Sequence, residues 1–532
     1  MQTVQVDTAA LDSFLVDWFS NPRWWFSATK DDDTYIRSKY ASFLSHEIHL
    51  DEFIAMQHTQ KLAWIIIYDQ LPRHIYRDTH ESTTQVKLFL ARAIKLVNTI
   101  CENDLLKNYT SDQVSFVLLP YRHSNDMKLV FTAMRIGWSI LKTTPNDQCI
   151  KRFLKATYTR APKDQAPLLN IQSPTYKTFL ISDFEHIMDA RCLTEKYAIP
   201  QTHNQKPACK IRDCVKRALH NDDSEIIISL SGGVDSIVLG YILSELHPKH
   251  LITAVHIDYA NRHTSTDEAA FVGAWCGHLG IKYVFRRIDE INRNDCMQYG
   301  LRSTYESYTR CVRFGTYKAV SNKPIVFLGH NLDDSFENIL TNITKMTKYE
   351  NLTGWDVHTH QDGIRFVRPM LHIDKKDIYT FASTHKLPFL YDSTVKWSQR
   401  GKIRDVIVPT LNQWNAHVIP AFFNLAQNST YMYTAMQSLV ESFIDKTYGT
   451  TLRMCATSPI LQNELFWRQY INRLMGVQIS KASLKSFIER VSRYCTSPKN
   501  RQCTKIILSK LLFVTLELNG LFLTLVFVMN SV

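Results

Sequence analysis

Hydrophobic side chains recur at two different spacings along this chain, and the change of spacing divides it into regions. In residues 1–195 apolar and aromatic positions return every three or four residues, as in LDSFLVDWF and KLFLARAIKLV, which predicts an all-helical domain. In residues 209–420 short β-branched runs such as EIIISL, LITAVHI and PIVFLGH alternate with helical stretches. This second pattern is typical of an α/β domain with a parallel sheet. The polar residues 196–208 include two prolines and predict a linker.

The last region, residues 421–532, again has helical spacing and ends in an apolar stretch, 506–528. Two charged residues and the pair Asn519-Gly520 interrupt that stretch. A membrane-spanning helix needs about 20 uninterrupted apolar residues, whereas Asn-Gly between two β-rich runs is a strong hairpin signal. We therefore expect a mostly helical region with a C-terminal β-hairpin and no membrane contact; a membrane segment is the alternative.

Composition and charge narrow the classes of protein. The 532 residues are 45% hydrophobic and 21% charged, with only 16 glycines and 17 prolines, which predicts several globular domains and excludes a collagenous or broadly disordered chain. The formal charge of +12 favours a polyanionic partner such as nucleic acid, but it also suits a basic enzyme. The 11 cysteines are scattered, and the first residues show no basic segment followed by an apolar one. We therefore expect reduced thiols and a cytoplasmic protein without a secretory signal.

The first strand of the middle region ends in a six-residue turn before a helix, made of Ser231, Gly232, Gly233, Val234, Asp235 and Ser236. Adjacent glycines let the backbone turn tightly and bring its N–H groups to an anion, and the start of the following helix favours negative charge. The pattern predicts a phosphate cradle, with a plain strand-to-helix turn as the alternative. Because a carboxylate beside phosphates repels them, we expect Asp235 to hold Mg²⁺.

This SGGVDS turn resembles the signature of the PP-loop superfamily, the N-type ATP pyrophosphatases, which have the adenine nucleotide alpha hydrolase-like fold. The resemblance implies a parallel-sheet domain that binds ATP, cleaves it between the α and β phosphates and adenylates a carbonyl oxygen. It does not by itself select the member of the superfamily.

Further motifs resemble those of the tRNA(Ile)-lysidine synthetases, in the family's order: AVHIDYANR, ESYTRCVRF, GHNLDDSFE, RPML, YDST and RGKIR. His256 joins the nucleotide-binding set by this resemblance. The candidate catalytic residues are Arg310, Arg313, His330, Asp334 and Glu337. The chain departs from the family pattern at Tyr259, Asn338 and Gly401, where the family usually has His, Thr and Asn.

The chemistry of these side chains agrees with the resemblance. Asp334 and Glu337 share a helical face after an apolar strand, where a doubly wound sheet binds its ligands. Two carboxylates there could hold Mg²⁺, with Asp235 and Asp334 as the metal set, or orient and deprotonate an amine. His330 could contact phosphate or the base. A helix cap or a solvated surface charge is the alternative for each carboxylate.

Pairs of arginines suggest contacts to phosphate. Arg310 and Arg313 lie on one helical face and could stabilise an adenylated intermediate or leaving pyrophosphate, although ordinary salt bridges are an alternative. Arg400 and Arg404 could clamp a tRNA backbone or a phosphate, or belong to a solvated basic loop. The absence of any CxxC pair disfavours the cluster-dependent tRNA thiolases.

The N-terminal region resembles a bacterial all-helical family of unknown function through its W-F pairs and the segments YDQLPR and LPYRHSND. Asn125 replaces that family's usual Glu. Asp69, Arg73, Arg77 and His123 could line a site for an anion, or form a buried polar network that fixes helix packing.

The resemblances together imply an ATP-dependent ligase. ATP with Mg²⁺ would adenylate the wobble cytidine of a tRNA(Ile), free lysine would displace AMP to give lysidine, and residues 421–532 would contact the tRNA. The alternatives are a PP-loop enzyme that acts on another tRNA base or nucleophile, and a non-catalytic scaffold with a vestigial ATP site.

Overall fold

The computed structural model describes residues 8–77, 82–161, 181–191, 205–219, 224–345, 351–391, 399–496 and 504–529. Contacts divide the chain into two compact units. The first comprises Met1–His330 and Val357–Asp392, and the second comprises Asn331–Asp356 and Ser393–Val532. Each unit is described by itself below.

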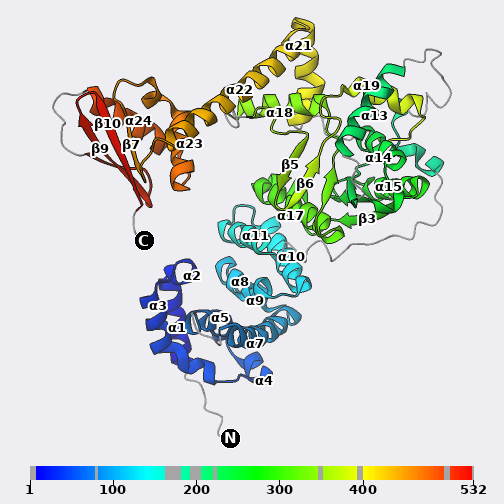
Figure 1. The fold of residues 1–532 in the computed structure, drawn as a ribbon. Helices are drawn as coiled ribbons and strands as arrows, with labels where there is room; N and C mark the ends of the chain where they lie inside the picture. Colours follow the sequence, from blue (N-terminus) through cyan, green and yellow to red (C-terminus); the bar gives the residue numbers. More distant parts are fainter. Residues whose placement is uncertain are drawn as a thin grey trace. The chain divides into compact units, whose positions relative to one another are not determined.

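The N-terminal part of the first unit is helical, as predicted (Figure 1). Its helices are α1 (Thr8–Ser20), α2 (Arg23–Phe26), α3 (Lys30–Tyr40), α4 (Leu50–Ala55), α5 (His58–Asp69), α6 (Leu71–Ile75), α7 (Ser82–Glu102), α8 (Ser111–Val117), α9 (Leu119–His123), α10 (Met127–Thr143) and α11 (Gln148–Arg160). Helix α5 is buried from Lys61 onward and is apolar on all sides between Leu62 and Tyr68, as expected of a central helix. Trp64 of α5 and Trp18 of α1 are both fully buried in this core.

The second part of the first unit is a six-stranded sheet with the order β3-β2-β1-β4-β6-β5. Its strands are β1 (Ile226–Ser229), β2 (Ile252–Asp258), β3 (Lys282–Arg287), β4 (Ile325–Phe327), β5 (His358–Gln361) and β6 (Ile364–Val367). Only β5, at one edge, is antiparallel to its neighbour. The chain moves outward from β1 in one direction through β2 and β3, and in the other through β4. The carboxyl end of β1 is therefore the switch point at which such sheets bind ligands.

Helices cover both faces of this sheet, which confirms the predicted α/β fold. They are α13 (Gln205–Leu219), α14 (Val234–Leu246), α15 (Ser265–Leu279), α16 (Arg293–Gln298), α17 (Arg302–Val320) and α19 (Lys375–Thr384). Ile226 and Ile228 of β1 point into a core formed with α13, α14, α15 and α19. Ile227 points to the opposite face, where Tyr317 of α17 packs. Helix α13 begins within the stretch predicted as a linker; residues 196–204 of that stretch lie outside the described residues.

Helices α10 and α11 pack against the sheet part of the same unit through an aromatic core. The Tyr158 hydroxyl accepts a hydrogen bond from Trp138 Nε1 and donates one to the Glu290 carbonyl, both at 2.8 Å. The Glu290 carboxylate accepts from Arg286 at 2.6 Å and from the Tyr308 hydroxyl at 2.9 Å. Arg286 is completely buried, and its Nε and Nη1 have no hydrogen-bond partner in the described structure. This ion pair therefore compensates the buried charge of Arg286 where α11 packs against the sheet part.

The second unit contains helices and an antiparallel sheet. Its elements are α18 (Leu332–Thr344), α20 (Gln399–Lys402), the π-helical turn η6 (Ile403–Ile407), α21 (Val408–Trp414), α22 (Val418–Ile444), β7 (Thr451–Cys455), α23 (Glu464–Met475), α24 (Lys481–Thr496), β8 (Thr504–Ile507), β9 (Leu512–Asn519) and β10 (Phe522–Met529). The predicted C-terminal hairpin is confirmed: β9 and β10 pair in antiparallel register, and Gly520 adopts a φ of +62° in the turn.

The hairpin is the centre of a larger sheet, with the order β7-β10-β9-β8. The sequence did not predict β7, which is short and lies between helices α22 and α23, or β8 as a separate strand, because its short run directly precedes the hairpin. Trp467 and Tyr470 of α23 pack against Phe527 of β10, so these aromatic side chains form core. None of the helices in the described ranges is long and apolar enough to cross a membrane.

Replacing the Glu290 carboxylate tests the role of its buried ion pair with Arg286. We expect Glu290→Gln to destabilise the packing of α17 by about 3 kcal/mol, because Arg286 is left as an uncompensated buried charge. The double variant Arg286→Met, Glu290→Leu should recover most of that loss. Hydrogen exchange of α17 peptides measures both effects; equal loss in the single and double variants would contradict this account.

Candidate functional site

The six-residue turn after β1 closes on itself through its two serines. The Ser236 hydroxyl accepts a hydrogen bond from the Ser231 N–H at 3.2 Å and donates one to the Gly233 carbonyl at 2.9 Å. The Ser231 and Ser236 hydroxyl oxygens lie 3.1 Å apart. Gly232 has a φ of +88°, in the left-handed region that favours glycine. The turn leads directly into the first turn of α14, whose N–H groups favour an anion.

Two glycines allow other segments to approach this turn closely. A Cβ built on Gly232 would lie 2.5 Å from Leu390 Cδ1, and the Leu390 N–H donates to the Gly232 carbonyl at 2.9 Å. A Cβ built on Gly329, after β4, would lie 3.0 Å from the backbone of Asp235 and Ser236. The end of β4 is therefore pressed directly against the start of α14. His330, the residue after Gly329, is thereby brought to the edge of the turn.

His256 stabilises the end of β1, directly before the turn, through a hydrogen bond. It lies on β2, is only 5% exposed, and its Nδ1 is 2.8 Å from the carbonyl of Leu230, the residue before the turn. Burial lowers the pKa of His256, which favours the neutral imidazole with Nδ1–H as the donor. Its position indicates that it fixes the end of β1; a direct contact to nucleotide remains a prediction.

The structure adds a residue that the sequence analysis missed, Lys375. Its ammonium group forms an ion pair with Asp235, and about a fifth of each side chain is exposed. Lys375 is the first residue of α19, where a cation opposes the helix dipole. That unfavourable position is the sequence signal that marks it, but the partner lies 140 positions away in the chain. A largely buried lysine beside the cradle is well placed to contact phosphate.

His330 is held by a second residue, Arg368, from the segment after β6. Arg368 is only 6% exposed; its Nε lies 3.2 Å from His330 Nδ1, and its Nη1 donates to Thr359 at 2.8 Å. The RPML motif thus fixes the orientation of His330.

The predicted carboxylates belong to the second unit. Asn331 and Asp334 form a capping box at the start of α18: the Asn331 side chain accepts from the Asp334 N–H, and the Asp334 carboxylate accepts from the Asn331 N–H at 3.1 Å. The helix-cap alternative therefore describes one role of Asp334.

Glu337 is joined to both arginines of the RGKIR motif. Arg404 Nη2 and Nε donate to Glu337 Oε1 at 2.9 and 3.2 Å, and Arg400 Nε lies 3.6 Å from Oε2. Arg404 lies in the π-helical turn, a feature often found at functional sites. Burial raises the pKa of Glu337 even though Arg404 opposes the shift. The sequence analysis assigned Glu337 and the two arginines to separate tasks, whereas the structure brings them together. Asp392–Thr394 of the YDST motif lie outside the described residues.

Arg310 and Arg313, both on α17, have different surroundings. The Arg310 side chain is exposed. Burial alone would lower the pKa of Arg313, yet the nearby phenol groups of Tyr259 and Tyr317 raise it. Tyr259, which replaces a family histidine, therefore lies beside Arg313.

The described residues do not form a metal cage of their own. No group of three or more His, Cys, Asp or Glu is placed to hold a metal ion in the described part of the chain. Asp235 already holds Lys375, and Asp334 caps α18. Mg²⁺ typically binds through one or two carboxylates together with substrate phosphates. Asp235, beside the turn, therefore fits an ion that arrives with its triphosphate better than a resident metal.

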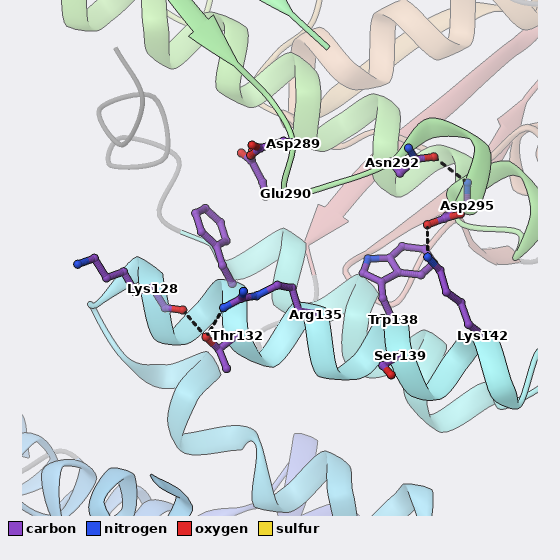
Figure 2. Close-up of a pocket in the computed structure, with 11 residues that line it drawn as sticks. Lys128, Thr132, Arg135, Trp138, Ser139, Lys142, Asp289, Glu290, Asn292 and Asp295 are labelled. Carbon is purple, nitrogen blue, oxygen red and sulfur yellow. Dashed lines mark hydrogen bonds and ion pairs between the residues drawn. The ribbon is translucent and has the colours of Figure 1, made fainter. Parts of the chain in front are cut away.

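A hollow of about 830 Å³ lies between α10 and the segment after β3 (Figure 2). Its lining combines Lys128, Arg135 and Lys142 of α10 with acidic residues that include Asp289 and Glu290. Lys142 pairs with Asp295 at 3.1 Å across it. None of the predicted site residues lines this hollow. It lies where α10 packs against the sheet part of the first unit.

A phosphate cradle at the switch point of a parallel sheet is typical of a nucleotide-binding α/β domain. Comparison with known protein families shows which kind of nucleotide-binding domain this is. Residues 203–411 match the family model of the PP-loop domain. Residues 15–164 match a family described as a bacterial protein of unknown function, DUF924. The chain therefore joins a DUF924 domain to a PP-loop domain.

The curated relatives include individual tRNA-modifying enzymes that match the same part of the chain. The tRNA(Ile)-lysidine synthase of Staphylococcus aureus (strain MRSA252) is 26% identical over 232 residues, which are 42% of this chain and 52% of that protein. The bifunctional protein TilS/HprT of Listeria monocytogenes serotype 4b is 26% identical over 238 residues, 43% of this chain and 36% of that protein. The chain thus spans about half or less of the length of these relatives. Among solved structures, the U34-tRNA thiolase NcsA from Methanococcus maripaludis aligns over 43% of this chain and 80% of its own, at 19% identity and a TM-score of 0.35.

Two neighbouring glycines provide a matched test of the cradle. We expect Gly232→Ala to lower the free energy of unfolding by about 1–2 kcal/mol from backbone strain alone, with a further cost from displacing Leu390. Gly233→Ala should be nearly neutral, because Gly233 has a φ of −70° and its Cβ would meet nothing closer than 3.6 Å. Urea denaturation measures both variants, and equal losses would contradict the assigned strain.

Removing the partner of Glu337 should produce a pH-dependent loss of stability. In Arg404→Met the pKa of Glu337 rises further, so the folded state binds a proton more tightly than the unfolded state does. Near pH 4 the carboxyl is largely protonated in both states and the loss is small; it grows as the pH rises through the pKa of the folded state. Urea denaturation between about pH 4 and pH 8 measures this trend. Arg400 is the weaker partner of Glu337, so Arg400→Met should show a smaller pH-dependent loss of stability. A pH-independent loss in Arg404→Met would contradict the account.

Proposed function

We propose that the chain is an ATP-dependent tRNA-modifying enzyme that converts the wobble cytidine of a tRNA(Ile) to lysidine. The observation that carries the proposal is the turn at Gly232. Its two serines are held by hydrogen bonds, Lys375 lies beside it, and the domain matches the PP-loop family. The names of the curated relatives support the choice of tRNA as substrate and of lysine as co-substrate.

In the proposed reaction, the cradle and Lys375 bind the triphosphate and orient its α phosphate. The cytidine O2 attacks that phosphorus and pyrophosphate leaves, which gives an adenylated base. The ε-amine of lysine then attacks C2, AMP leaves, and the proton lost from the amine passes to a base. Mg²⁺ that arrives with ATP would neutralise phosphate charge when bound.

The remaining residues take supporting roles in this proposal. His330, oriented by Arg368, is the candidate for contacting phosphate or the base. Glu337 is the candidate for receiving the amine proton, because a carboxyl with a raised pKa is a better proton acceptor near neutral pH. Arg313 is the candidate for stabilising negative charge on the adenylate, and Arg400, which is half-exposed, for contacting the tRNA backbone.

The decisive experiment incubates the full chain with ATP, tRNA(Ile) transcript and isotope-labelled lysine. Pyrophosphate release is measured, and the tRNA nucleosides are analysed by mass spectrometry. We expect release that requires tRNA, and a cytidine whose mass has increased by that of lysine less one water. A different mass increase would indicate another nucleophile, and release without tRNA would contradict the proposal.

Adjacent lysines provide the matched variants. Lys375→Met should lower kcat/KM about a hundredfold, because it removes one cation from the phosphates and leaves Asp235 uncompensated beside them. Lys376→Met, which alters an exposed neighbour, should retain activity. Equal activity in both variants would remove Lys375 from the mechanism.

A further inference from the structure

The DUF924 domain contains a buried carboxylate whose contacts are already complete. Asp69, the last residue of α5, is 2% exposed. His123 Nδ1 lies 2.9 Å from both of its oxygens, Arg73 Nη2 donates to Oδ1 at 3.2 Å, and the Gln70 side chain donates to Oδ2. Arg77, which the sequence grouped with these residues, instead pairs with Asp33 at 2.9 Å. Asp69, Arg73 and His123 thus form the predicted polar network without Arg77.

Two further arginines, which the sequence analysis did not single out, lie beside this network. Arg122 is the neighbour of His123 on α9, and Arg160 is the last residue of α11. The charges of Arg73, Asp69 and Arg160 all act on Arg122, and those of Arg73 and Asp69 act on Arg160. Partial burial is the main cause that lowers the pKa of both guanidinium groups, and the neighbouring cations add to it. Arg122 is the more buried of the two, and Arg160 lies exposed at the end of α11.

The charge balance of this cluster distinguishes Arg122 and Arg160 from Arg73. Within the described ranges no carboxylate forms an ion pair with Arg122 or Arg160, and the buried Nε of Arg122 has no hydrogen-bond partner. The cluster therefore has three arginines against one aspartate, and that aspartate already serves Arg73, His123 and Gln70. A polar network that served packing alone would be expected to balance its charges and satisfy its donors.

We propose that Arg122 and Arg160, together with Arg73 and His123, bind the phosphate group of a small molecule or free phosphate in the DUF924 domain. Guanidinium groups bind phosphate oxygens through paired N–H donors, and two unpaired ones suit a dianion. Asp69 holds Arg73 and His123 in place and does not itself contact the ligand. The site is independent of the PP-loop and does not rest on the proposed tRNA reaction.

Calorimetric titration of the full chain with inorganic phosphate tests the proposal, with sodium chloride at matched ionic strength as the reference. Because the cradle is also expected to bind phosphate, the titration is repeated on Lys375→Met, which impairs the cradle alone. We expect saturable binding that persists in Lys375→Met and weakens at least tenfold in Arg160→Gln. Arg160 is exposed, so its replacement leaves the fold intact.

Arg152→Gln is the matched control, since Arg152 is an exposed arginine on the same helix. It should bind phosphate as the parent chain does, and Arg160→Gln should retain pyrophosphate release. Titrations with AMP and with pyrophosphate distinguish a phosphorylated ligand from free phosphate. Binding that survives Arg160→Gln, binding that is lost in Lys375→Met, or binding of citrate but not phosphate would each overturn the proposal.

Discussion

The positive φ of Gly232 is the constraint on which the proposed nucleotide site depends. It turns the chain sharply between β1 and α14, at the switch point of the sheet. The turn is supported on several sides: His256 holds the end of β1, Leu390 hydrogen-bonds to the Gly232 carbonyl, and Gly329 packs against the start of α14. A side chain at either of these glycines would displace one of these supports, so the local fold and the anion site are one structure.

Much of this arrangement could be predicted from the sequence, because it is encoded locally. The three isoleucines of β1, the adjacent glycines of the turn and the Asn-Gly pair of the hairpin each specify their own backbone within a few residues. A short strand whose pairing partner is distant in the chain, such as β7, which pairs with β10, could not be predicted in this way.

The ion-pair partners of charged residues could not be predicted from the sequence either, because the tertiary fold determines which charges meet. Lys375 meets Asp235 across 140 positions, and Arg404 meets Glu337 across 67. Arg77 resembles a member of the Asp69 network in sequence, yet it lies with Asp33. Arg122 lies within the LPYRHSND segment, and Arg160 lies in no motif. What distinguishes both is that, within the described ranges, they lie near Asp69 without an ion pair to a carboxylate. In each case the informative quantity is a local charge balance.

The most direct test of the central claim is a crystal structure of the chain bound to α,β-methylene-ATP, which resists cleavage between its first two phosphates. The account predicts that the phosphates lie against the N–H groups of residues 232–236 and the ammonium group of Lys375. A triphosphate bound elsewhere, with the Gly232 turn empty at saturating nucleotide, would contradict it.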